Sequence, residues 1–128
     1  AGQSKYSFSK MLQLAAAGYC GLSAFGPRQA AQPAPGIEQV NTHIDIIDWR
    51  GGRGFIGEAP ALEQATRHLA ARRGGAADAD EPTGWLTHHA VHDGACRDFL
   101  ARLFDATRAE AGVNWRHPAD IFGGGHPG

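Results

Sequence analysis

Residues 38–73 read EQVNTHIDIIDWRGGRGFIGEAPALEQATRHLAARR, and this stretch decides the predicted fold class. It predicts a strand over residues 38–44, a glycine-rich loop over 50–57 and a helix over 60–73. Pro60 suits the first turn of such a helix, because proline lacks the N–H that this turn leaves without an intrahelical partner. Leu62, Ala65 and Leu69 recur at helical spacing and predict its inner face. A strand followed by a helix of this length is typical of parallel α/β proteins.

The same alternation continues on both sides of this stretch. Asp93 is a predicted cap for a second amphipathic helix, which Gly112 is expected to end. The inner face of that helix is predicted from apolar spacing: Cys96, Phe99, Leu100, Leu103 and Phe104. The remaining predicted elements are a helix over 8–17, strands over 19–24, 83–87 and 113–116, and a flexible tail over 123–128. We therefore expect an α/β fold of parallel βα units, forming a single domain or part of one.

Bulk properties exclude some classes of protein. The 128 residues have a formal net charge of −1 and an isoelectric point near 6.7, which argues against a nucleic-acid partner bound by charge. No apolar run reaches the roughly 18 residues that a membrane span requires, so we expect none. The two cysteines lack the spacing of a metal site. Cys96 falls on an apolar helix face and is predicted to be a buried free thiol.

Two predicted strand ends are rich in reactive side chains. Asp45, Asp48 and Trp49 follow one strand, and the segment His88-His89-Ala90-Val91-His92-Asp93 follows another. In parallel α/β folds, chemistry collects just beyond the carboxyl ends of the strands. A carboxylate beside an imidazole orients the ring and favours its protonated form, which makes a proton donor usable near neutral pH.

These two segments resemble motifs of the NodB-type polysaccharide deacetylases. Asp45-x-x-Asp48-Trp49 is similar to the fourth motif of that family, and Leu86-x-His88 is similar to the fifth. The resemblance implies that His88 is the general acid that protonates the departing sugar amine and that Asp48 tunes it. Trp49 and Leu86 would wall the pocket for the acetyl methyl group. Asp45 would either belong to this pocket or accept hydrogen bonds from its own loop.

The resemblance further implies the later part of a distorted (β/α) barrel, an N-acetylated carbohydrate substrate and a divalent metal, by expectation zinc. The family's metal-binding motifs, an Asp pair and then a His pair, have no counterpart here, and residues 1–10 contain no Asp, Glu or His. We therefore expect the ligands and the base to come from a missing N-terminal portion of the domain. The chain by itself is expected to be inactive.

Two other functions remain open from the residues alone. His88 and His92 are four apart, a spacing that lets two imidazoles on one helical turn reach the same ion, so His88, His92 and Asp48 form an alternative metal set. That set would make a self-contained metal hydrolase. The third possibility is a non-catalytic α/β binding module. Of the other histidines, His43 is predicted to pack within the sheet and His89 to face solvent.

Overall fold

A computed structural model of the chain describes residues 21–22, 25–26, 38–117 and 120–121. The predicted helix over 8–17 and the predicted tail over 123–128 lie outside the described residues, as does Cys20. Only part of the predicted strand over 19–24 is described, as β1 (Gly21–Leu22). The other elements are β2 (Glu38–Gln39), β3 (Ile44–Asp45), α2 (Glu58–Arg73), β4 (Trp85–Leu86) and α3 (Gly94–Thr107).

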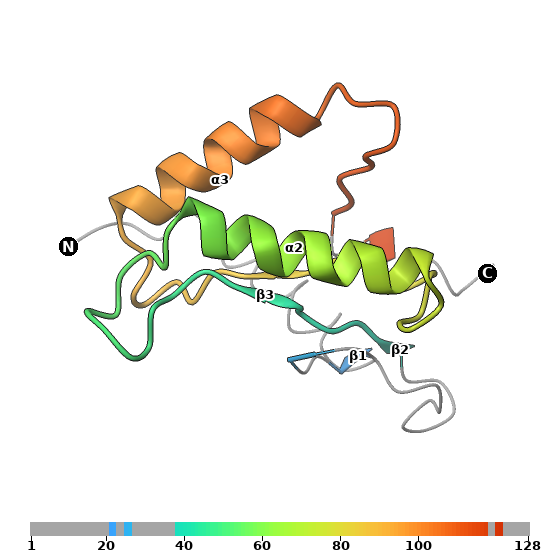
Figure 1. The fold of residues 1–128 in the computed structure, drawn as a ribbon, viewed down its shortest axis with the longest axis horizontal. Coiled ribbons are helices and arrows are strands. Elements are labelled where there is room, and N and C mark those ends of the chain that lie inside the picture. Colours follow the sequence, from blue (N-terminus) through green and yellow to red (C-terminus); the bar gives the residue numbers. More distant parts are fainter. Residues whose placement is uncertain (1–20, 23–24, 27–37, 118–119, 122–128) are drawn as a thin grey trace, which may run out of the picture.

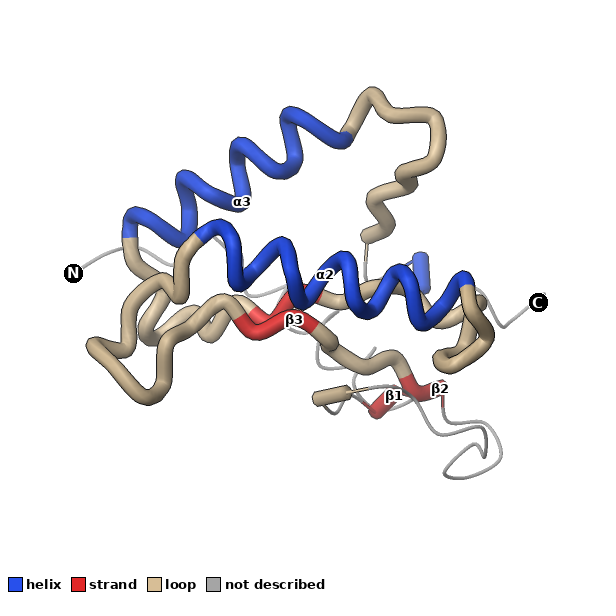
Figure 2. The backbone as a smooth tube through the Cα atoms, viewed as in Figure 1, coloured by secondary structure: helices blue, strands red, loops and turns tan. Residues whose placement is uncertain are grey.

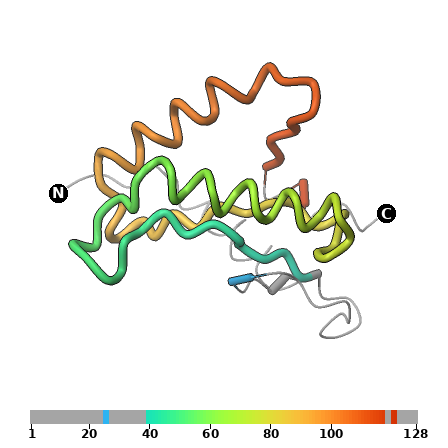
Figure 3. Tube along the Cα trace, viewed as in Figure 1, coloured from blue at the N-terminus to red at the C-terminus, as the bar shows by residue number. Residues whose placement is uncertain are grey.

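The strands pair in parallel, as the alternation of elements predicts. β1 pairs with β2, and β3 pairs with β4, with Ile44 opposite Trp85 and Asp45 opposite Leu86. Figure 3 shows the segments of β3 and β4, distant in the sequence, running beside each other. The fold is therefore of mixed α/β content with parallel strand pairs.

The predicted strand over 38–44 is interrupted, and the cause is a buried polar contact. Asn41 donates its backbone N–H to Glu81 Oε1 at 3.0 Å, so this N–H is not available to a neighbouring strand. Its side-chain amide donates to the carbonyl of Gly26 at 2.9 Å. β2 therefore ends before Asn41, Thr42 makes a single parallel bridge with Phe25, and β3 pairs with a different strand, β4.

The core lies where α2 and α3 meet the segment around β3 (Figures 1 and 2). Phe99 of α3 is 2% exposed, and its ring centroid is 5.0 Å from that of Phe55 and 5.9 Å from that of Trp85. Cys96 is buried and free, which confirms the prediction. Burial raises the pKa of its thiol, so this cysteine favours the protonated form. The buried apolar residues are Ile44, Ile46, Ile47, Ala61, Ala65, Cys96 and Phe99.

The predicted inner face of the first amphipathic helix is wrong in part. Ala65 is buried as expected, but Leu62 is 38% exposed and Leu69 is 51% exposed. The buried side of α2 instead carries Ala61, Ala65 and His68. The reason is a bidentate contact, because the Gln64 amide accepts from the Asp45 N–H and donates to the Asp45 carbonyl, both at 3.0 Å. This contact turns the small alanines, rather than the leucines, toward β3.

α3 begins as predicted and ends earlier. The Asp93 side chain caps it by accepting from the Cys96 N–H at 2.8 Å. The helix ends at Thr107, before Gly112, and the predicted strand over 113–116 is wrong because these residues are irregular. Phe104 is 43% exposed and contacts the ring of Trp115, whose indole N–H donates to the Thr107 hydroxyl at 3.0 Å. None of the described helices is long and apolar enough to cross a membrane.

Asp93 also joins the start of α3 to the glycine-rich loop, because its second oxygen accepts from the Phe55 N–H at 3.1 Å. The hydrogen bond from Cys96 is the main cause that lowers the pKa of Asp93. A carboxyl with a lowered folded pKa contributes stability above its unfolded pKa of about 4 and loses it as the pH falls through the folded value. Asp93→Ala should therefore reduce stability at neutral pH and make it less sensitive to acidification below about pH 4.

Urea unfolding of the wild type, Asp93→Ala and Asp98→Ala at several pH values measures this effect. Asp98 is exposed on the same helix and is the matched control. If the wild type and Asp93→Ala lost stability in parallel on acidification, the Asp93 carboxylate would not be the group responsible.

Candidate functional site

Asp45 lies at the carboxyl end of β3 and is held from several sides. Its Oδ1 accepts from the Ile47 N–H at 3.0 Å, and its Oδ2 accepts from the Trp49 indole N–H at 2.8 Å. The same Oδ2 is 3.1 Å from His88 Nε2. The Gln64 amide fixes the Asp45 backbone. The carboxylate is therefore positioned by its own loop, by α2 and by a tryptophan.

His88 follows β4 by two residues and has a left-handed backbone with φ of 45°. Its side chain is 28% exposed, and its ring meets that of Trp49 edge-on with centroids 4.7 Å apart. A carboxylate can only accept, so the contact with Asp45 assigns a proton to His88 Nε2. Among the described residues Nδ1 has no hydrogen-bond partner. The arrangement leaves Nδ1 as the atom that can exchange a proton with a bound molecule.

The carboxylate at His88 is thus Asp45, not Asp48 as the sequence predicts. Asp48 Oδ1 accepts from the backbone N–H groups of Arg50 and Gly51, at 3.2 and 2.9 Å. The Asp48 N–H donates in turn to the carbonyl of Gly54 at 2.9 Å. Asp48 therefore closes the turn beyond β3, whereas Asp45, opposite Leu86 in the ladder, is two residues from His88 in register. Asp45 also accepts from its own loop, which is one of the two roles considered for it.

Trp49 and Leu86, the predicted pocket walls, both lie next to this pair. Trp49 is 47% exposed, and Leu86 is partly buried in β4. Two surface depressions lie instead on the second half of α2, both of them lined by Leu69 and Arg73. Neither depression includes Trp49 or Leu86.

The alternative metal set is not brought together. Within the described part of the chain, the acidic, imidazole and thiol groups that converge to within 4.8 Å are those of His43, His68 and Glu81, so His88, His92 and Asp48 do not form such a group. His89 is exposed, as predicted. His92 is partly buried, and its Nε2 is buried without a hydrogen-bond partner.

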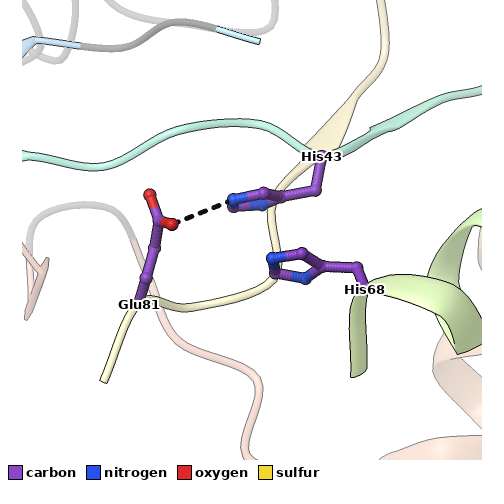
Figure 4. Close-up of side chains that lie close together, drawn as sticks. All are labelled: His43, His68 and Glu81. Atoms are coloured by element: carbon purple, nitrogen blue, oxygen red, sulfur yellow. Dashed lines mark ion pairs between the residues drawn. The ribbon is translucent and has the colours of Figure 1, made fainter. Parts of the chain in front are cut away.

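The convergent group, which we call the buried histidine cluster, comprises His43, His68 and Glu81 (Figure 4). The rings of His43 and His68 stack with centroids 3.7 Å apart, and His43 Nε2 is 3.2 Å from Glu81 Oε2. The three residues are 8%, 7% and 0% exposed. His43 is buried, as the prediction of core packing requires, but it precedes β3 and does not lie within a strand. His68 and Glu81 were not expected to join it. The one signal in the sequence is that His68 follows Ala65 by three and Ala61 by seven, which places it on the apolar face.

Both rings accept or share hydrogen bonds at Nδ1, and burial and charge determine the protonation state of His68. The Gly84 N–H donates to His43 Nδ1 at 3.0 Å, and the Thr83 hydroxyl contacts His68 Nδ1 at 3.0 Å. Burial is the main cause that lowers the pKa of His68, and electrostatic interactions with His43 and Arg72 lower it further, against an opposing effect of Glu81. His68 therefore favours the neutral imidazole.

No known protein family, curated protein or solved structure matches the chain.

Proposed function

We propose that this chain carries the proton-transfer element of a NodB-type polysaccharide deacetylase, in which Asp45 replaces Asp48 as the partner of His88. The observation that carries the proposal is the contact between Asp45 Oδ2 and His88 Nε2, 3.1 Å apart at the carboxyl ends of two adjacent parallel strands. The proposal includes the later part of a distorted (β/α) barrel as the setting of these strands.

The chemistry of amide hydrolysis explains what this pair does. The tetrahedral intermediate formed on an acetamido carbon collapses to acetate only if the departing nitrogen leaves as a neutral amine, so it has to gain a proton. His88 supplies that proton from Nδ1, because its Nε2 is directed at Asp45. Asp45 keeps the ring in this orientation and stabilises the charged form of the imidazole before transfer.

The backbone of His88 supports a functional role. A non-glycine residue in the left-handed region is uncommon, although histidine adopts it more readily than most residues. The φ of 45° turns the chain directly after β4, and the Val91 N–H closes the turn by donating to the His88 carbonyl at 2.9 Å. Such backbone conformations persist only where the surrounding structure holds them, and they are concentrated at active sites.

The proposed substrate is an N-acetylated carbohydrate. Trp49 presents an exposed indole beside the imidazole of His88, and a flat aromatic surface of this kind packs against the apolar face of a sugar or an acetyl methyl group. Its indole N–H is already used by Asp45, so Trp49 offers the substrate an apolar contact.

The deacetylase family that this chain resembles uses a divalent metal, which we expect to be zinc, to polarise the acetyl carbonyl and activate the attacking water. In the described residues no third ligand joins Asp45 and His88, so the pair does not fit a metal site and serves proton transfer alone. The proposal therefore requires the metal ligands and the base from residues other than these.

The test compares two carboxylates in the same loop. The assay measures acetate release from N-acetylglucosamine oligomers by the polypeptide that joins these 128 residues to the metal-binding segment that the resemblance implies. Asp45→Asn should lower kcat by about 10²-fold, because the ring loses its anionic partner. Asp48→Asn should leave kcat close to the wild-type value, because the amide oxygen still accepts from Arg50 and Gly51.

Opposite results for the two variants would restore Asp48 as the partner of His88. No acetate release by the wild-type polypeptide would remove the deacetylase proposal altogether. The 128 residues by themselves are expected to release little or no acetate.

A further inference from the structure

The buried histidine cluster contains polar atoms that the protein itself does not satisfy. His43 Nε2 and His68 Nε2 are both buried without a hydrogen-bond partner. His43 Nε2 is 3.2 Å from Glu81 Oε2, but this contact does not have the direction of a hydrogen bond. Buried polar nitrogens are nearly always hydrogen-bonded, because leaving one unsatisfied costs stability. Two such atoms beside one buried carboxylate therefore call for a ligand.

The types and spacing of these atoms fit a transition metal. Two imidazole nitrogens and a carboxylate oxygen are ligands that zinc accepts, at distances of about 2.0–2.2 Å. Two ligands of a tetrahedral ion at that distance lie about 3.4 Å apart, which is close to the 3.2 Å between His43 Nε2 and Glu81 Oε2. One potential ligand atom from each of the three residues lies within 4.8 Å of the other two.

We propose that His43, His68 and Glu81 form a buried zinc site that joins β3, α2 and the loop before β4. The three ligands come from segments separated by 25 and 13 residues in the sequence, as their positions show. The ion contributes two positive charges opposite one buried carboxylate and two neutral rings, and a water molecule completes its coordination. The inference does not depend on the proposed function, because it concerns other side chains.

Neighbouring residues contact each ligand, and the two stacked rings have to tilt apart for both lone pairs to meet one ion. Thr83 Oγ1 accepts from Arg72 at 3.2 Å and lies 3.0 Å from His68 Nδ1. When His68 Nδ1 carries the proton and donates to this oxygen, Nε2 presents its lone pair to the ion, the usual arrangement of a metal-bound histidine. Glu81 Oε1 accepts from the Asn41 N–H at 3.0 Å, which directs Oε2 toward the rings.

Coordination by His43 Nε2 has one structural consequence. It moves the ring proton of His43 to Nδ1, where the Gly84 N–H now donates. The Gly84 amide then has to leave this position, so its NMR resonance should move when zinc binds. The same resonance should not move in a variant that cannot hold the ion.

The position of the site indicates a stabilising role. His43 precedes β3 and Glu81 precedes β4, so the cluster lies at the amino ends of the two strands, whereas Asp45 and His88 lie at their carboxyl ends. In parallel α/β folds reactions take place beyond the carboxyl ends of the strands, so a site at the amino ends suits a stabilising role. The ligands are also at most 8% exposed, so the surrounding protein shields the ion from solvent.

The experiment uses the full chain, freed of metal by a chelator and then dialysed against zinc. We expect one equivalent of bound zinc, a higher Tm with zinc than without it, and the visible absorption of tetrahedral Co²⁺ when cobalt replaces zinc. His68→Gln and Glu81→Gln should each weaken zinc binding by more than about 100-fold, the upper range for loss of a group that only orients a ligand. His89→Gln makes the same substitution at an exposed histidine and should bind zinc as the wild type does.

Two results would overturn the site. One is a wild-type chain that holds no stoichiometric zinc after dialysis, a measurement that needs no variant. The other is zinc binding that His68→Gln and Glu81→Gln leave unchanged. Circular dichroism of each variant shows whether it has folded. If a variant does not fold, the change in the NMR resonance of the Gly84 amide when zinc binds to the wild type still tests the site.

Discussion

His88→Ala should lower kcat by about 10²–10⁴-fold and change KM little in the polypeptide proposed to be a deacetylase. In the proposed mechanism the imidazole donates its proton to the departing nitrogen, an interaction that develops only in the transition state. The same proposal assigns ground-state binding to the neighbouring indole, since Trp49 offers an exposed apolar surface beside His88. The loss should therefore appear in the catalytic step.

Steady-state kinetics on N-acetylglucosamine oligomers measures the two constants separately. His89→Ala is the matched control, because it removes the adjacent and exposed imidazole, and it should leave both constants unchanged. Added imidazole should restore part of the activity of His88→Ala, since a free donor can occupy the vacated space. A rise in KM with unchanged kcat would mean that His88 binds substrate without transferring a proton.

The start of α3 could be predicted because its determinants are local. Asp93 accepts from a backbone N–H three residues later, and Cys96 and Phe99 follow at the spacing of one helical face. An N-cap and a periodic pattern depend only on nearby residues. The parallel pairing of β3 and β4 could be predicted for a similar reason, since a helix lies between them in the sequence.

The exact rotation of α2 could not be predicted, because its apolar residues cover one broad face. Leu62 and Leu69 lie at one edge of that face, Ala61 lies at the other edge, and Ala65 lies between them. Periodicity does not choose between the two edges, and the larger leucines are the natural choice. The contact of Gln64 with the backbone of Asp45 decides the rotation, and it joins residues 19 apart.

The choice between Asp45 and Asp48 depends on the register of the strands. Two carboxylates three residues apart both follow a predicted strand, and the sequence does not say where the strand ends. Because β3 ends at Asp45, opposite Leu86, the first carboxylate lies near His88 and the second lies in the turn. Glu81 was missed for a related reason, since nothing nearby in the sequence predicts a fully buried glutamate in a polar loop.

Phe99→Ala should lower the free energy of unfolding by about 3–5 kcal/mol, the usual cost of deleting a buried phenyl ring. Phe99 is 2% exposed and lies against the rings of Phe55 and Trp85, so its removal leaves a cavity bounded by α3, β4 and the glycine-rich loop. Trp85 begins β4 and lies three residues before His88 in the chain. The loss of stability should therefore be accompanied by loosening of the candidate site.

Phe104→Ala is the matched control, because it makes the same change in the same helix and has the same effect on helix propensity. Phe104 is 43% exposed and contacts only Trp115 among the rings of the described residues, so its replacement should cost no more than about 1 kcal/mol. Urea unfolding of the two variants measures the difference. Equal losses would mean that the two rings are buried to a similar extent, and that α3 does not present Phe99 to the strands. A larger loss for Phe99→Ala would locate the stabilising contacts on the side of α3 that faces β3 and β4. These are the strands that position the candidate site, since β3 ends at Asp45 and β4 ends two residues before His88.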